Sequence, residues 1–216
     1  MSMKKFLFAM AIGLFATIGC TNNQSEKAEC CGERKNPVIE NIMSRRSIRA
    51  YKDQAVPREL LDQVVECGIY APNAMNAQQW EVRIVDSKEW IDKTTEAYKQ
   101  NMKGTPGEKM IADPSFKNMF RNAPAVIFIG HKPGMFTQVD CGLMAGNMMH
   151  AAKSLGLGTV CMAGPVMFFK ESAGKAYLES LGFSEGYEPL LCIGIGYADE
   201  EPAAKPRNKE VIKYVE

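Results

Sequence analysis

The chain has 216 residues, of which 26 are basic and 25 acidic, and its formal net charge is +1. This length and a hydrophobic content of 46% are typical of one globular domain with a substantial core, which excludes a disordered or fibrous protein. The balanced charge excludes the basic footprint of a nucleic-acid-binding protein.

The first twenty residues have the pattern of an export signal. Lys4 and Lys5 precede an apolar run, Phe6 to Ile18, that is too short to span a bilayer comfortably. The run ends at Cys20 in a motif that resembles the lipobox of bacterial lipoproteins, although Thr17 stands where that motif usually has Leu. We therefore expect lipidation of Cys20 and a protein exported and anchored to the bacterial cell envelope. An ordinary secreted protein and a buried N-terminal helix are the alternatives.

Three regions follow from this pattern: a signal peptide at 1–20, a flexible polar tether at 21–35 and a folded domain at 36–216. The tether contains the adjacent Cys30 and Cys31, which could be redox-active, bind a soft metal or have no role. The domain contains four cysteines in apolar periodic segments, where Cys usually behaves as a small hydrophobic residue. These are Cys67, Cys141, Cys161 and Cys192.

A metal site is not expected from the sequence. The chain contains no C-x-x-C motif. The two histidines, His131 and His150, have no metal-ligand spacing with any carboxylate or thiol.

The folded part is predicted to begin with a short helix that delivers a cluster of cations. Asn36 is a suitable N-cap before Pro37, and apolar residues follow at helical spacing to Met43. The next six residues, 44–49, contain three arginines and two serines. Arginine binds phosphate bidentately and serine adds a hydroxyl donor, so this segment is a candidate phosphate site, with a solvated basic surface as the alternative.

The middle of the chain alternates between helices and strands. A second helix is predicted from Pro57 to Ile69, a strand at 81–86 and a helix at 88–102. Between the first two, residues 71–80 contain Pro and two Asn and predict an irregular loop. Residues 104–122 are apolar but interrupted by Pro and Gly, which is typical of either a lid or a surface excursion.

The second half is predicted to supply the centre of the sheet. Residues 124–129 predict a strand covered on both faces, and further strands are expected at 159–163 and 190–196. A capping box of Thr137 and Asp140 opens a helix to Leu155 that is small or apolar all round, so we expect it to be buried, against its own copy in a dimer. A helix is expected at 168–181, and residues 210–216 are expected to add to a sheet edge, either of the same chain or of a partner subunit. Together these elements indicate an α+β sheet flanked by helices.

Four motifs in this order resemble the nitroreductase family of flavin enzymes. They are S-R-R-S-I-R at 44–49, A-P-N-A-M-N-A-Q-Q-W at 71–80, G-L-G-T-V-C-M-A-G at 156–164 and K-P-R at 205–207. The similarity extends from Pro37 to the C-terminus. It implies a nitroreductase-like fold, a homodimer with an exchanged C-terminal arm, and FMN bound at the subunit interface.

The resemblance also implies which residues hold FMN. The phosphate and ribityl chain would be held by Arg45, Arg46, Ser47 and Arg49, with Lys205 and Arg207 completing the phosphate cage. Pro72, Asn73 and Asn76 would approach from the other subunit, and Met162, Ala163 and Gly164 would pass beneath the ring. Two positions depart from the family: Gln79 replaces a common Pro, and Ala163 stands where some relatives have Glu.

The implied activity is an FMN-dependent oxidoreductase that transfers hydride from NAD(P)H to nitroaromatic or quinone-type acceptors in ping-pong order. The flavin performs the redox chemistry, so no catalytic side chain is expected. A same-fold enzyme that performs dehalogenation, flavin fragmentation or azoline oxidation is one alternative, and a lipid-tethered flavin-binding protein without turnover is another. Export adds a constraint, because NAD(P)H is scarce outside the cytoplasm and another electron source would then be needed.

Overall fold

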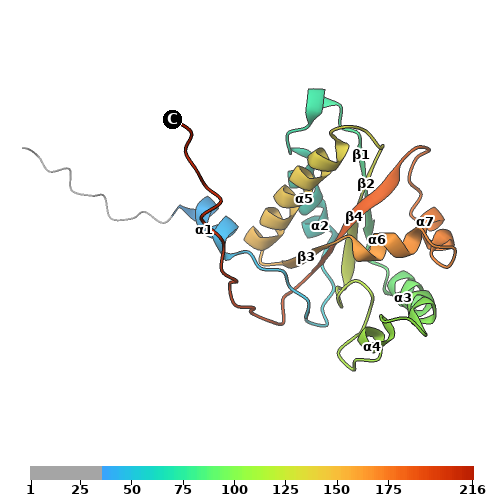
Figure 1. The fold of residues 1–216 in the computed structure, drawn as a ribbon. Helices are drawn as coiled ribbons and strands as arrows, with labels where there is room; N and C mark the ends of the chain where they lie inside the picture. Colours follow the sequence, from blue (N-terminus) through green and yellow to red (C-terminus); the bar gives the residue numbers. More distant parts are fainter. Residues whose placement is uncertain (1–35) are drawn as a thin grey trace, which may run out of the picture. The chain divides into compact units, whose positions relative to one another are not determined.

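A computed structural model describes residues 36–216 (Figure 1). The predicted signal peptide, the lipidation site Cys20 and the tether with Cys30 and Cys31 lie outside the described residues. No helix among residues 36–216 is both long and apolar enough to cross a membrane.

The domain alternates helices with four strands, as an α+β protein does. In chain order the elements are α1 (Pro37–Ser44), α2 (Arg58–Ile69), a 3-10 turn η1 (Ala74–Asn76), β1 (Trp80–Val85), α3 (Lys88–Met102), α4 (Glu108–Ile111), β2 (Ala125–His131), α5 (Thr137–Ser154), β3 (Gly158–Met162), α6 (Gly164–Phe169), α7 (Lys175–Ser180) and β4 (Glu188–Gly196). The predicted fold class is confirmed.

The strands form one antiparallel sheet in the order β1-β2-β4-β3. Every residue of β2 is buried, which confirms the prediction of a central strand covered on both faces. β3 lies at one edge of the sheet, directly after α5 in the chain. This edge becomes the position of the candidate site.

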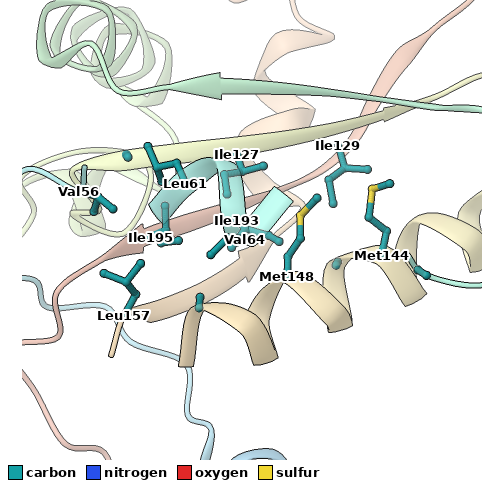
Figure 2. Close-up of a cluster of buried hydrophobic side chains, with 14 of the residues drawn as sticks. Val56, Leu61, Val64, Ile127, Ile129, Met144, Met148, Leu157, Ile193 and Ile195 are labelled. Atoms are coloured by element: carbon teal, nitrogen blue, oxygen red, sulfur yellow. The ribbon is translucent and has the colours of Figure 1, made fainter. Parts of the chain in front are cut away.

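One face of the sheet packs against α2 and α5 (Figure 2). Met144 and Met148 of α5 point into a cluster with Ile127 and Ile193 of the central strands. Helices α2 and α5 approach so closely that a Cβ added at Gly68 would lie 2.5 Å from the Cε of Met148. Burial of these side chains holds α5 rigidly along the sheet.

The other face of the sheet is covered by aromatic side chains from α3 and α6. Phe128 of β2 makes edge contacts with Trp90 and Phe120, at ring-centroid distances of 6.0 and 5.8 Å. Phe169 of α6 lies 5.6 Å from the same ring. Such aromatic pairs add about 0.5–1.5 kcal/mol each beyond area burial.

The prediction of one continuous helix at 168–181 is wrong. The structure has two short helices, α6 and α7, separated by a turn at 170–174. A Cβ at Gly174 would lie 2.2 Å from the carbonyl oxygen of Phe168, so the chain folds back tightly there and only glycine fits. Helix α6 begins earlier than predicted because Pro165 occupies its first turn, a start signal that the prediction overlooked.

The first helix is capped as predicted, but α5 is not. Asn36 Oδ1 accepts hydrogen bonds from the backbone N–H groups of Val38 and Ile39 at 2.9 and 3.3 Å. By contrast, the capping box at Thr137 is wrong, because the N-cap of α5 is Phe136 and makes no side-chain capping bond. The Thr137 hydroxyl instead lies 2.8 Å from Nδ1 of His131.

Helix α5 is buried on one side only in the single chain. Val139 is 63% exposed and Leu143 44% exposed, and the faces at Gly142 and Gly146 are open. The predicted burial of α5 on all sides is therefore not reached within one chain.

After β4, residues 197–216 contain an isolated bridge between Tyr51 and Ala198 but no strand, so the segment 210–216 does not add to this sheet.

Candidate functional site

The cationic segment 44–49 lies along the open edge of β3. Ser47 forms a parallel bridge with Thr159, and the N–H of Ile48 donates to the Thr159 carbonyl at 2.9 Å. Gly158 allows this approach, because a Cβ there would lie 2.7 Å from Cγ1 of Ile48. The edge of the sheet therefore fixes the backbone from which the arginines project.

The chain after β4 holds the same segment from its other side. The N–H of Lys52 donates to Tyr197 O at 2.9 Å, and the N–H of Asp199 donates to Ala50 O at 3.0 Å. The carboxylate of Glu200 accepts from the N–H groups of Arg49 and Ala50. The segment is therefore hydrogen-bonded to β3 on one side and, on the other, to the chain that follows β4. We call this chain, residues 197–216, the arm; it leads to the predicted phosphate ligands.

Glu200 was missed by the sequence reasoning. It lies in an acidic run, Asp199 to Glu201, near the start of the arm, and such a run is usually a solvated surface. The signal that could have identified it is its place directly after the last core strand and before the K-P-R motif. It is a positioning residue for the cationic segment.

Removing the Glu200 carboxylate should loosen the cationic segment. In Glu200→Ala, two N–H groups lose a charged acceptor, which costs about 1.5–3 kcal/mol for a charge-assisted pair. We expect the variant to show faster hydrogen exchange at Arg49 and Ala50, measured by mass spectrometry, with Glu201→Ala as the matched control. Equal exchange in both variants would show that the carboxylate does not hold the segment.

A cavity of about 640 Å³ opens beside the first arginines. We call it the basic cavity. Arg45 and Arg46 line it, together with Gly158 and Thr159 of β3 and residues 200–204 of the arm. Its size lies within the range of small-molecule sites.

A second cavity, of about 330 Å³, continues along the same strand. We call it the methionine cavity, after Met110, Met119 and Met162 in its wall. Arg49 also lines it, as do Ala163 and Gly164 directly after β3. Of the residues predicted to hold the cofactor, the basic cavity is lined by Arg45 and Arg46 and the methionine cavity by Arg49, Met162, Ala163 and Gly164, whereas Ser47 lines neither.

Arg45 has the feature expected of a ligand-binding cation. Within residues 36–216, the buried side-chain nitrogens without a hydrogen-bond partner are Arg45 Nη1 and His150 Nδ1. Burial, and secondarily the charge of Arg45, lower the pKa of His150, so the imidazole is neutral at pH 7. A buried guanidinium N–H without an acceptor is costly, and the same side chain lines the basic cavity.

The neighbouring arginines are partly used within the chain. Arg46 Nη1 donates to the carbonyls of Met43 and Arg45 at 2.7 and 2.8 Å, which satisfies the C-terminal end of α1. Arg49 Nη1 donates to Ser47 O at 3.2 Å. Both guanidinium groups retain further donors for a ligand.

The loop at residues 71–80, which we call the Asn-rich loop, lies at the N-terminal end of α5. The Asp140 carboxylate accepts the N–H of Ala74 at 3.2 Å, so Asp140 anchors this loop instead of capping its own helix. Pro72, Asn73 and Asn76 line neither cavity. The 15 residues from Asp140 to Ser154, the last residue of α5, span roughly 20 Å, so this loop is far from the arginines of the same chain.

The same loop contains several left-handed residues. Met75, Asn76 and Gln78 have φ values of 55°, 51° and 48°. The side chain of Asn73 supports this conformation by accepting the Gln78 N–H at 2.9 Å. Left-handed residues other than glycine are costly and gather at functional sites.

The last predicted ligands lie just outside the basic cavity. Ala204 lines the cavity, but Lys205 and Arg207 do not, and both are exposed. Arg207 Nη1 donates to Lys205 O at 3.3 Å. Completion of the cage by these two residues stays a prediction.

The four cysteines of the domain divide into two classes. Cys141 and Cys192 are buried as predicted, and burial raises the pKa of the Cys141 thiol to about 11. Cys67 and Cys161 are exposed, so the prediction of a hydrophobic role is wrong for them. Within residues 36–216, no three His, Cys, Asp or Glu side chains lie close enough to hold a metal ion.

Comparison with known proteins identifies the fold. The Nitroreductase family model matches residues 42–197. The chain belongs to the nitroreductase family. This confirms the predicted family and covers the motifs at 44–49, 71–80 and 156–164, but the match ends at Tyr197, before the K-P-R motif at 205–207.

Individual relatives cover most of this nitroreductase. It is 30% identical over 186 residues to an FMN reductase (NAD(P)H) from Bacillus subtilis, which covers 80% of this chain and 70% of the relative. A nitroreductase with bound FMN from Bacteroides fragilis has a TM-score of 0.75 and 26% identity, and covers 84% of this chain and 100% of that one. An iodotyrosine deiodinase from Thermotoga neapolitana is 24% identical over 182 residues, or 79% and 93% of the two chains.

Proposed function

We propose that this protein is an FMN-dependent oxidoreductase that takes hydride from NAD(P)H and passes it to nitroaromatic or quinone-type acceptors in ping-pong order. The observation that supports this most is the side chain of Arg45, which lines the basic cavity and has a buried Nη1 without a hydrogen-bond partner in the described part of the chain. A phosphate monoester is a fitting ligand, because it offers several charged acceptors to a guanidinium and to the Ser44 and Ser47 hydroxyls of the same segment.

The chain's own residues would bind and orient the cofactor. Arg45, Arg46 and Ser47 would hold the phosphate end, with Lys205 and Arg207 from the arm. Arg49 would lie at the ring end, and Met162, Ala163 and Gly164 would form the surface beneath the ring. Bound FMN supplies the redox chemistry itself, so these residues need only position it and exclude water.

A homodimer follows from where the two halves of the site lie. Arg45 and Arg46 line the basic cavity together with Lys153, near the C-terminal end of α5, and the Asn-rich loop is bonded to Asp140, near its N-terminal end. A two-fold axis that packs α5 against its copy in antiparallel fashion would bring the loop of one chain to the arginines of the other. Apolar residues exposed on α1 and α5 supply the surface for this contact; they are Val38, Ile39, Ile42, Met43, Val139 and Leu143.

A spectrum tests the cofactor and the reaction together. Freshly purified protein should be yellow, with the absorbance of oxidised FMN, and anaerobic titration with NADH or NADPH should bleach it. Addition of a quinone or nitroaromatic should then restore the colour. A colourless protein that takes up no added FMN would overturn the assignment, and colour that no nicotinamide bleaches would favour a flavin-binding protein without turnover.

Dehalogenation is the second candidate reaction. The match to an iodotyrosine deiodinase favours it over flavin fragmentation and azoline oxidation. Iodide release from a halogenated phenol by the reduced protein, under conditions where nitroaromatics are not reduced, would select this alternative.

Export and lipid anchoring are part of the proposal and rest on the first twenty residues. Lys4, Lys5 and the apolar run before Cys20 direct the chain out of the cytoplasm, so an electron source other than soluble NAD(P)H would be needed there. Wild-type protein should fractionate with membranes, and Cys20→Ala should release it. A wild-type protein found wholly in the soluble cytoplasmic fraction would refute export.

A further inference from the structure

The methionine cavity carries charge of one sign. Of its twelve lining residues, the charged ones are Arg49 and Arg121, and both are cations. Most of the remaining wall is apolar or aromatic, with Phe116, Met110 and Met119 from the segment before β2. An apolar slot with convergent cations suits a planar ligand that bears an anionic group.

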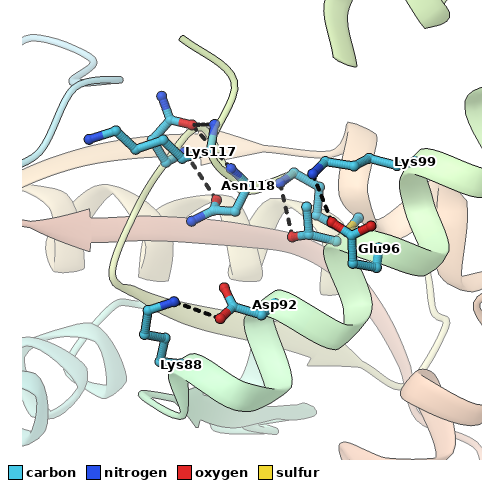
Figure 3. Close-up of polar contacts among 9 residues, drawn as sticks. Lys88, Asp92, Glu96, Lys99, Lys117 and Asn118 are labelled. Atoms are coloured by element: carbon cyan, nitrogen blue, oxygen red, sulfur yellow. Dashed lines mark hydrogen bonds and ion pairs between the residues drawn. The ribbon is translucent and has the colours of Figure 1, made fainter. Parts of the chain in front are cut away.

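Arg121 is held at the cavity by a strained loop. Its φ is +55° and that of Asn122 is +67°, values that non-glycine residues adopt rarely. Two asparagine side chains hold the loop in this shape (Figure 3). Asn122 Oδ1 accepts from Lys117 N at 2.8 Å, and Asn118 Oδ1 accepts from Asn122 N at 3.0 Å.

The same network connects the loop to the cationic segment. Asn122 Nδ2 donates to the Arg49 carbonyl at 3.4 Å and to the Ser115 carbonyl at 3.0 Å. The N–H of Met119 donates to Thr95 on α3 at 3.3 Å. The loop that contains Arg121 is therefore bonded to the backbone of Arg49, although the two residues are 72 positions apart in the sequence.

No Asp or Glu of residues 36–216 lines the methionine cavity. Burial raises the pKa of the Tyr98 hydroxyl, while Arg121 opposes this shift and Glu171 adds to it. Glu171 does not line the cavity, and its carboxylate accepts from Asn101 Nδ2. No ion pair involving Arg121 occurs among residues 36–216, whereas Arg58 and Arg83 are both paired with acids.

We propose that the acceptor binds in the methionine cavity beside the flavin ring, that this position selects acceptors that carry an anionic group, such as aromatic carboxylates, and that Arg121 pairs with the anion. This inference rests on the proposed function, in which Arg49 is committed to the cofactor and Arg121 is left for the second ligand. Arg121 is then a specificity-determining residue. It acts through a charge-assisted contact that a neutral acceptor of the same shape cannot make.

Two nearly isosteric acceptors test the proposal. For the wild-type flavin-loaded protein, KM for 4-nitrobenzoate should be lower than KM for neutral 4-nitrobenzamide. Arg121→Gln should reduce the amide-to-carboxylate KM ratio by about tenfold, whereas Arg121→Lys should retain part of it. Lys117→Gln is the matched control, because it removes one positive charge four residues away at an exposed position outside the cavity.

Equilibrium binding supplies a readout that is independent of turnover. Benzoate and benzamide are titrated into the oxidised protein and followed by the shift of its flavin absorbance. Benzoate should bind more tightly, and raising the salt concentration should weaken benzoate binding alone. Circular dichroism and flavin content establish that each variant is folded and loaded.

Three outcomes would overturn the inference. One is an equal preference for the two acceptors in wild-type protein, and the second is an Arg121→Gln ratio equal to that of Lys117→Gln. The third is an Arg121→Gln effect confined to KM for NADPH or to flavin retention, which would place the cation on the dinucleotide or the cofactor. A protein that binds no flavin is a different failure, because it removes the proposed function itself.

Discussion

Arg45→Ala is expected to lose FMN on dialysis while wild-type protein retains it. The variant removes the guanidinium whose Nη1 is buried without a partner within the described part of the chain. Loss of a charge-assisted contact costs about 1.5–3 kcal/mol, which is roughly a ten- to hundredfold rise in the dissociation constant. Fluorescence titration of the apoprotein with FMN measures it directly.

The control for this experiment is another arginine far from the cavities. Arg58 is exposed and pairs with Asp86 at 2.6 Å, and it lines neither the basic nor the methionine cavity. Arg58→Ala should retain FMN, as should Cys67→Ser. If Arg45→Ala binds FMN as tightly as these two variants, Arg45 is not part of the phosphate site.

Leu143→Glu is expected to dissociate the dimer and to release FMN with it. Leu143 is 44% exposed on the open face of α5 in the single chain. In the proposed dimer this face is covered, so a carboxylate there would be buried without a partner. We expect at least a hundredfold weaker association, on the order of 3 kcal/mol, measured by sedimentation velocity.

Ile84→Glu serves as the matched change on the opposite edge of the sheet. Ile84 is 36% exposed on β1, the edge strand opposite β3. It should leave both the sedimentation coefficient and the flavin content unchanged. A monomeric wild-type protein that still binds FMN stoichiometrically would contradict the dimer.

Much of the fold could be predicted from local patterns. The helix starting at Pro37 follows from its Asn36 cap, and β2 follows from an unbroken apolar run. The break at Gly174 could not be predicted, because it depends on a close approach to the carbonyl of Phe168, a contact that helical periodicity does not encode. The spacing of hydrophobic residues predicts which side of a helix is buried, but it does not predict where the helix ends and the chain reverses direction.

The phosphate-binding character of the site could be predicted from the sequence, but the residues that hold the arginines in place could not. The arginines of 44–49 signal phosphate by their chemistry. Glu200 and Asn122 carry no such signal, because their roles come from contacts with Arg49 across 151 and 73 residues. Asp140 shows the same limit. A local motif predicted that it caps its own helix, whereas its carboxylate accepts the Ala74 N–H and anchors a loop.

The central claim is that each flavin site takes Arg45 from one chain and Asn76 from the other. It is tested most directly with a heterodimer of an Arg45→Ala chain and an Asn76→Gly chain, each carrying its own affinity tag. Gly suits this position because Asn76 has a φ of 51°. One site of the heterodimer would then be intact and the other would lack both residues.

The measured quantity is the FMN content of the doubly purified heterodimer, compared with both homodimeric variants. The account predicts half the wild-type flavin content, with the homodimers nearly empty. If each site were built within a single chain, every site would carry one defect, and the heterodimer would be as empty as the homodimers.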